Sequence, residues 1–77
     1  MPRFFFDIFD GARLWTDDEG SEHDTLDDAR REAVDTLTQM ARDSFPRDAA
    51  RSVSVEIRPD TDPAVERIVV ALSFEKL

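Results

Sequence analysis

Residues 25–46 read TLDDARREAVDTLTQMARDSFP and decide the fold, because they carry the clearest helical pattern in the chain. Thr25 is a good N-cap residue, since its hydroxyl can accept a backbone N–H of the first helical turn. Pro46 disfavours helical geometry at the residue before it. The spacing therefore predicts one helix over residues 26–44. Small and apolar residues recur at steps of three and four and form one stripe, which comprises Leu26, Ala29, Ala33, Leu37, Met40, Ala41 and Ser44.

The segments on both sides of the helix alternate between apolar and polar residues, which is the two-residue period of strands. Phe4, Phe6 and Ile8 share one face in the first of them. The dipeptide Asp10-Gly11 then predicts a hairpin turn, because both residues tolerate positive φ. The predicted strands cover residues 3–10, 12–17, 52–58 and 65–74.

This order predicts a single domain over residues 1–77, a two-layer α+β fold of the form ββαββ. One helix covers one face of a four-stranded, mainly antiparallel sheet. The first and last strands are apolar on both faces, which favours central positions and the strand order 2-1-4-3, with 2-1-3-4 as the alternative. The residues expected to face the helix are Phe4, Phe6, Ile8, Leu14, Val53, Val55, Ile57, Ile68, Val70, Leu72 and Phe74.

The charge of the chain is concentrated in its first half. Residues 7–28 hold nine acidic residues and one basic residue, so this segment alone accounts for the formal net charge of −8. A field of that sign repels phosphate, and direct nucleic-acid binding is disfavoured. The absence of cysteine excludes a disulfide framework and a thiolate metal site. No stretch has the length of a signal peptide or a membrane span, so a cytoplasmic location without membrane association is expected.

The opening MPRFFFDIFDG, the DDEG that follows and the LDDARREA of the helix start resemble a family of short, uncharacterised proteobacterial proteins. Members begin Met-Pro-Arg-aromatic-Phe-Phe, continue with Asp-Gly and Asp-x-x-Gly, and then have a Leu-x-x-Ala-rich helix and two closing strands. The resemblance covers nearly the whole chain and implies no established activity, so no catalytic residue is carried over. This chain departs from the pattern at His23-Asp24, where an apolar residue is commoner, and in its longer, proline-bracketed second hairpin turn.

The main functional indication is a set of apolar residues expected on the sheet face that the helix leaves open. Three large aromatic residues on such a face form a patch of the kind that marks an interaction site. The predicted interaction surface comprises Phe5, Phe9, Trp15, Val69 and Ala71.

The sequence predicts no catalytic, cofactor-binding or metal-binding residues. His23 lies among carboxylates but is the only histidine, and the neighbouring acids lack the spacing of an EF-hand loop. A solvated loop histidine is the expected reading. Carboxylate pairs such as Asp17 and Glu19 need a partly dry pocket for acid–base catalysis, which a thin two-layer fold rarely encloses. We therefore expect a protein that is not an enzyme.

Two classes of function remain open. The first is a non-enzymatic module that binds a protein or a second copy of itself through the open sheet face. The alternative is a small regulatory module, antitoxin-like or linked to nucleic acid, and rests on fold analogy alone. It would require the basic residues Arg42, Arg47, Arg51 and Arg58 to line one groove, yet acids are interleaved among them.

Overall fold

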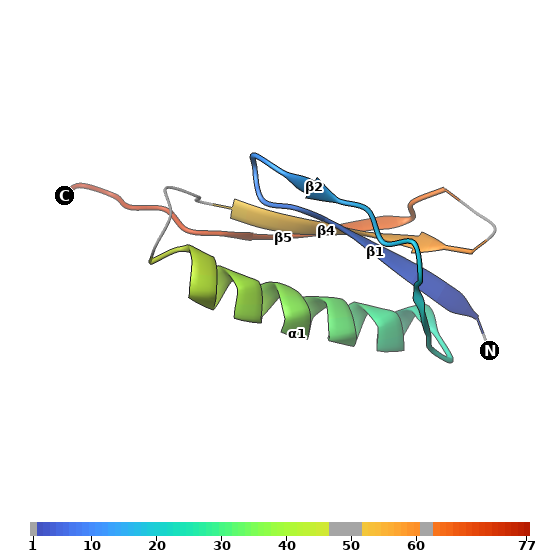
Figure 1. Ribbon diagram of the computed structural model, residues 1–77. Coiled ribbons are helices and arrows are strands. Elements are labelled where there is room, and N and C mark those ends of the chain that lie inside the picture. Colours follow the sequence, from blue (N-terminus) through green and yellow to red (C-terminus); the bar gives the residue numbers. More distant parts are fainter. Residues whose placement is uncertain (1, 47–51, 61–62) are drawn as a thin grey trace.

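A computed structural model describes residues 2–46, 52–60 and 63–77, and it has two layers, with one helix packed against one face of a sheet (Figure 1). The predicted α+β fold class is confirmed, but the sheet has five strands rather than four. The elements in chain order are β1 (Arg3–Phe9), β2 (Leu14–Trp15), β3 (Ser21–Glu22), α1 (Leu26–Ser44), β4 (Ser52–Pro59) and β5 (Glu66–Ala71).

The helix α1 begins and ends at the predicted residues. Thr25 caps it, because the Thr25 hydroxyl accepts the backbone N–H of Asp28 at 3.2 Å. Acidic side chains in the first turn and Arg42 in the last turn complement the helix dipole. These interactions are local, and so the sequence pattern was sufficient to locate them.

The strand order is β2-β1-β4-β5, with every pair antiparallel. In the numbering of the predicted strands this is 2-1-3-4, so the preferred order 2-1-4-3 is wrong and the alternative is correct. The polar outer face of β4 had suggested an edge strand. Instead, Arg58 on β4 contacts Asp7 on β1, and Glu56 on β4 contacts Arg67 on β5. Polar residues on a central strand are satisfied here by both neighbouring strands.

Of the predicted second strand over residues 12–17, only β2 at Leu14–Trp15 forms, and β3 at Ser21–Glu22 is a further strand that was not predicted. β2 and β3 pair with opposite ends of the same edge of β1. Between them the carboxylate of Asp17 accepts the backbone N–H of Phe6 at 3.1 Å, and Asp7 accepts the N–H of Asp17 at 2.9 Å. Between β2 and β3, the backbone of β1 therefore binds a side-chain oxygen instead of a neighbouring backbone. This separates β2 and β3 into two strands.

The core lies between α1 and the strands β1 and β4, and its residues are Phe4, Ala29, Ala33, Leu37, Ala41, Val53, Val55 and Ile57. Three residues expected in it are exposed: Leu14, Leu72 and Phe74. Leu14 projects from the opposite face. The other two follow β5, which ends at Ala71 and not at residue 74; among the described residues Ala71 is the last that pairs with β4.

Candidate interaction surface

The sheet face turned away from α1, called the open face, carries one apolar row across four strands. The strand registers place Leu14 beside Phe9, Phe9 beside Ser54, and Ser54 beside Val69. Directly paired residues of antiparallel strands project from the same side of a sheet, so these four side chains stand together. Phe9 is 46% exposed, Leu14 61% and Val69 55%. We call this set the apolar row. It comprises the apolar residues Leu14, Phe9 and Val69 and the small Ser54 that lies between Phe9 and Val69.

Small side chains at the centre of this row leave a hollow. Ser54 stands between Phe9 and Val69, and the next pair along the sheet is Ser52 with Ala71. The hollow has a volume of about 520 Å³, and its lining comprises Asp7, Phe9, Leu14, Ser52, Ser54, Glu56, Arg67 and Val69. Apolar walls bordered by charged residues match the core and rim of protein–protein interfaces.

A charged row borders the apolar row on the open face. Asp7 pairs in register with Glu56, and Glu56 pairs with Arg67. The Arg67 guanidinium contacts Glu56 at 2.6 Å, while Nε of Arg58 contacts Asp7 at 3.2 Å. Each of these four charges therefore has a partner of opposite sign. The border is polar, but it presents little unbalanced charge to a partner.

Phe5 lies on the open face but is half-buried by its own chain. The guanidinium of Arg58 stacks 4.6 Å from the centre of the Phe5 ring. The backbone of Gly20 also comes so close that a Cβ there would lie 3.0 Å from Cε1 of Phe5. Phe5 is thus on the expected face and part-exposed, with these contacts covering the rest of its ring.

Trp15 lies on the helix side of the sheet, which corrects its predicted place on the open face. It pairs with Ile8, whereas Leu14 pairs with Phe9 and takes the expected place of Trp15. The turn from Asp10 to Arg13 has four residues. A hairpin loop with an even number of residues always pairs an odd-numbered residue of one strand with an even-numbered residue of the other, as in Phe9 with Leu14. An even number of residues in this loop was therefore the feature of the sequence from which the position of Leu14 on the open face could have been predicted.

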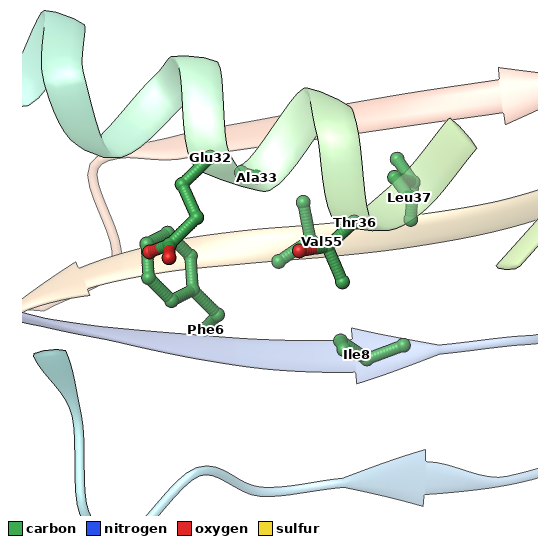
Figure 2. Close-up of a pocket in the computed structure, with 7 residues that line it drawn as sticks. All are labelled: Phe6, Ile8, Glu32, Ala33, Thr36, Leu37 and Val55. Carbon is green, nitrogen blue, oxygen red and sulfur yellow. The ribbon is translucent and has the colours of Figure 1, made fainter. Parts of the chain in front are cut away.

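A second, smaller hollow lies between α1 and β1 on the helix side. Its volume is about 70 Å³, and Figure 2 shows the side chains of Phe6, Ile8, Glu32, Ala33, Thr36, Leu37 and Val55 around it. The helix lies mainly over β4 and β5, so it leaves this flank of β1 less covered. Trp15 stands on the same side of the sheet, 42% exposed, with the Arg13 guanidinium 5.4 Å from its ring centre.

The carboxylate of Asp17 has a structural role in this arrangement. Burial raises the pKa of Asp17, whereas hydrogen bonds from the backbone N–H groups of Gly20, Phe6 and Glu19 and the charge of Arg58 lower it, and the net pKa lies below the ordinary value. A carboxyl group with a lowered pKa stays ionised near neutral pH. It is therefore suited to accept structural hydrogen bonds and not to donate a proton in catalysis. That the protein is not an enzyme remains a prediction.

His23 is more enclosed than a solvated loop histidine. Its Nε2 lies 3.1 Å from the Ser21 hydroxyl and 2.7 Å from a carboxylate oxygen of Glu32. Its ring also contacts the rings of Phe4 and Phe6. Within the described ranges no group of three or more His, Cys, Asp or Glu side chains could hold a metal ion. Metal independence stays a prediction.

The alternative function, a regulatory module linked to nucleic acid, would require four arginines to line one groove. The two of them that the structure describes do not lie together. Arg42 lies on the last turn of α1, while Arg58 lies on the open face and is held by Asp7 and by the backbone oxygen of Asp17. Arg47 and Arg51 fall outside the described residues. These two described arginines are thus on opposite layers of the fold.

Comparison with known proteins identifies the family of the chain but no activity. A family model described as a domain of unknown function (DUF6894) matches residues 3–71. A search of curated proteins and a search of solved structures gave no match. In the part of the chain that the structure describes, no helix is long and apolar enough to span a membrane.

Proposed function

We propose that this chain, which belongs to the DUF6894 family of domains of unknown function, is a non-enzymatic protein-interaction module. The apolar row of the open face is the contact surface. The observation that carries the proposal is the exposure of Phe9, Leu14 and Val69 in one row around a hollow. In protein interfaces a few residues in well-packed pockets, fully removed from water, supply most of the binding energy.

The chemistry of the surface supports a protein ligand. The apolar row has no basic side chain, and the neighbouring arginines are engaged by Asp7 and Glu56. A phosphate-bearing ligand would find little free positive charge here. The partner surface that fits is an apolar ridge with a polar margin, as in many transient protein complexes.

No observation on the described residues favours the alternative of a regulatory, nucleic-acid-linked module. Arg58 is committed to ion pairing and Phe5 lies beneath it, so neither is arranged to stack on a base. A cytoplasmic location remains an expectation from the sequence.

Position-specific photo-crosslinking in the source cells tests the proposal. A photoreactive phenylalanine analogue is placed at Leu14 or Val69, and in a control at Arg31, which is exposed on the outer side of α1. We expect a discrete crosslinked product from positions 14 and 69 that is absent from position 31. Phe9→Asp, combined with the probe at Leu14, should remove the product from position 14 because it puts a charge into the apolar row.

Two results would overturn the proposal. One is equal crosslinking from positions 14 and 31, and the other is a product from position 14 that persists unchanged in the Phe9→Asp background. Mass spectrometry of the product identifies the partner, including the case of a second copy of the chain. Circular dichroism of Phe9→Asp checks that the variant is folded.

A further inference from the structure

The strand β5 forms one edge of the sheet among the described residues, since the order ends with it. An edge strand presents unpaired backbone N–H and C=O groups, and proteins commonly protect it with charges, prolines or bulges. After Glu66 and Arg67, however, β5 continues Ile-Val-Val-Ala, a sequence with strong preference for strands. This edge is therefore well suited to pair with another strand.

The chain continues past Ala71 in a direction that extends β5. Figure 1 shows it running outward beyond the end of α1. Its sequence keeps the two-residue alternation, so Leu72 and Phe74 follow Ile68 and Val70, while Ser73 and Glu75 follow Arg67 and Val69. Leu72 is 38% exposed. Residues 66–76 thus have the pattern of one long strand, of which the first part is paired with β4.

We propose that a second copy of this chain pairs antiparallel with residues 66–76, with Ala71 opposite Ala71 of the second copy. This register puts Arg67 opposite Glu75 and Glu66 opposite Lys76, and by symmetry each ion pair forms twice. It also puts Ile68 opposite Phe74, Val70 opposite Leu72, and Val69 opposite Ser73. Opposite charges and apolar pairs across antiparallel strands each stabilise the sheet.

Neighbouring registers are disfavoured by the same charges. A slip of one residue in one direction puts Glu66 opposite Glu75, and in the other direction it puts Arg67 opposite Lys76. Like charges directly opposite each other destabilise a strand pair. A slip of two residues in either direction leaves Glu75 opposite a valine. Only the register centred on Ala71 pairs both acids with both bases.

The surroundings of β5 fit this second strand. Arg30 of α1 binds Glu66 at 2.5 Å and also binds Asp27, so the three charges sum to −1. Lys76 of the second copy would bring that cluster to neutrality. One helical turn after Arg30, Val34 is 44% exposed on the same flank. Phe74 of the second copy, opposite Ile68, would cover it.

The resulting dimer has one continuous sheet with both helices on the same side. Its two open faces then meet across Ala71, so the two apolar rows lie on one surface. This inference goes beyond the proposed function, because it concerns the edge of the sheet and a defined partner. The apolar row could bind a partner without it, and the dimer could form without the apolar row.

Sedimentation of the full chain tests the pairing through charge reversal. The wild type should show concentration-dependent dimerisation. Glu75→Arg should raise the dimer dissociation constant about tenfold or more, because two attractive pairs become repulsive. Arg67→Glu combined with Glu75→Arg should lower the dissociation constant relative to Glu75→Arg alone, because the pairs between the copies are restored, while the ion pair of Arg67 with Glu56 within the chain is lost. Asp43→Arg, an equal charge change on the exposed side of α1, should have little effect.

Cysteine crosslinking tests the register, and the natural chain contains no cysteine to interfere. Ala71→Cys should form a disulfide-linked dimer readily on oxidation, because two-fold symmetry puts the two sulfurs together. Ser73→Cys alone should not, but a mixture of Ser73→Cys with Val69→Cys should. A wild type that stays monomeric at millimolar concentration would overturn the dimer. An unchanged dissociation constant in Glu75→Arg, or equal crosslinking of the position 71 and 73 variants, would overturn the proposed pairing. Phe9→Asp should leave all these results unchanged, which separates this proposal from the open-face function.

Discussion

The carboxylate of Asp17 accepts the backbone N–H of Phe6 at 3.1 Å and so occupies the gap between β2 and β3 along the edge of β1. The other carboxylate oxygen accepts the N–H groups of Glu19 and Gly20. One side chain thus satisfies donors on the strand and on the turn beside it. The hydrogen bonds of the Asp17 carboxylate hold the turn against the sheet, so that the backbone of Gly20 lies close to the ring of Phe5.

Replacing Asp17 with alanine should destabilise the protein by about 1–3 kcal/mol, because partly buried donors then lose their acceptor. Urea unfolding followed by circular dichroism measures the free energy of unfolding. The neighbouring Asp18 is exposed, and Asp18→Ala serves as the control. Equal losses in the two variants would contradict the role assigned to Asp17.

Stability should fall in acid because three carboxylates, those of Asp10, Asp17 and Glu66, have lower pKa values in the folded chain. The hydrogen bond from Arg30 and its charge lower the pKa of Glu66, and the donors around Asp17 lower its pKa against the opposing effect of burial. In acid the unfolded chain therefore binds more protons than the folded chain. The stabilisation is complete above the ordinary carboxyl pKa of about 4 and is lost as pH falls through the lower folded values.

Thermal unfolding between pH 6 and pH 2.5 measures this dependence. We expect a roughly constant melting temperature down to the ordinary carboxyl pKa and a steep fall below it. The double variant Asp17→Asn, Glu66→Gln should start lower and show a shallower fall, since two groups that take up protons are gone. A wild-type slope in that variant would assign the acid sensitivity to other carboxylates.

Leu37→Asp should unfold the protein. Leu37 is 1% exposed at the centre of the core, and an unpaired carboxylate there has no partner. The total stability expected for 77 residues is only about 4–11 kcal/mol. Thr38→Asp, on the exposed side of the same helical turn, should retain the helical circular dichroism signal. A cooperative thermal transition at the wild-type temperature for Leu37→Asp would contradict the packing.

The two glycines should respond differently to alanine. Both have positive φ, +96° at Gly11 and +72° at Gly20, so each substitution costs about 1 kcal/mol in backbone strain. A Cβ at Gly11 meets no atom within 4 Å, but one at Gly20 would lie 2.9 Å from Cγ of Arg3 and 3.0 Å from the backbone oxygen of Phe4. Chemical denaturation should show the larger loss for Gly20→Ala. Equal losses would show that the turn yields easily.

Chelation or addition of divalent metal should leave the melting temperature unchanged. His23 is held by Ser21 and Glu32 and by contacts with two phenylalanine rings. A ligand that binds only the folded state raises the free energy of unfolding by an amount that grows with the logarithm of its affinity, so thermal scans with EDTA and with millimolar zinc are a direct measure. A rise with one metal that His23→Ala abolishes would revive a metal site.

Features that depend on neighbours along the chain could be predicted from the amino-acid pattern alone. The stripe from Ala29 to Ala41 and the cap at Thr25 predicted α1 to the residue, because capping and periodicity are local. The alternation in residues 52–58 likewise predicted β4 within one residue. The fold class followed, since one amphipathic helix can cover only one face of such a sheet.

Tertiary structure decided which strand is central, which face carries Trp15, and which aromatic residues are covered. Apolar content suggested the wrong strand order, because it cannot show that Glu56 and Arg58 on β4 find partners on both neighbouring strands. The face of Trp15 depended on the length of one loop, since a change of one residue turns every side chain of a strand over. Phe5 was covered by residues distant in sequence. Such contacts form between segments that are distant in the sequence. The pattern of neighbouring residues along the chain therefore does not predict them.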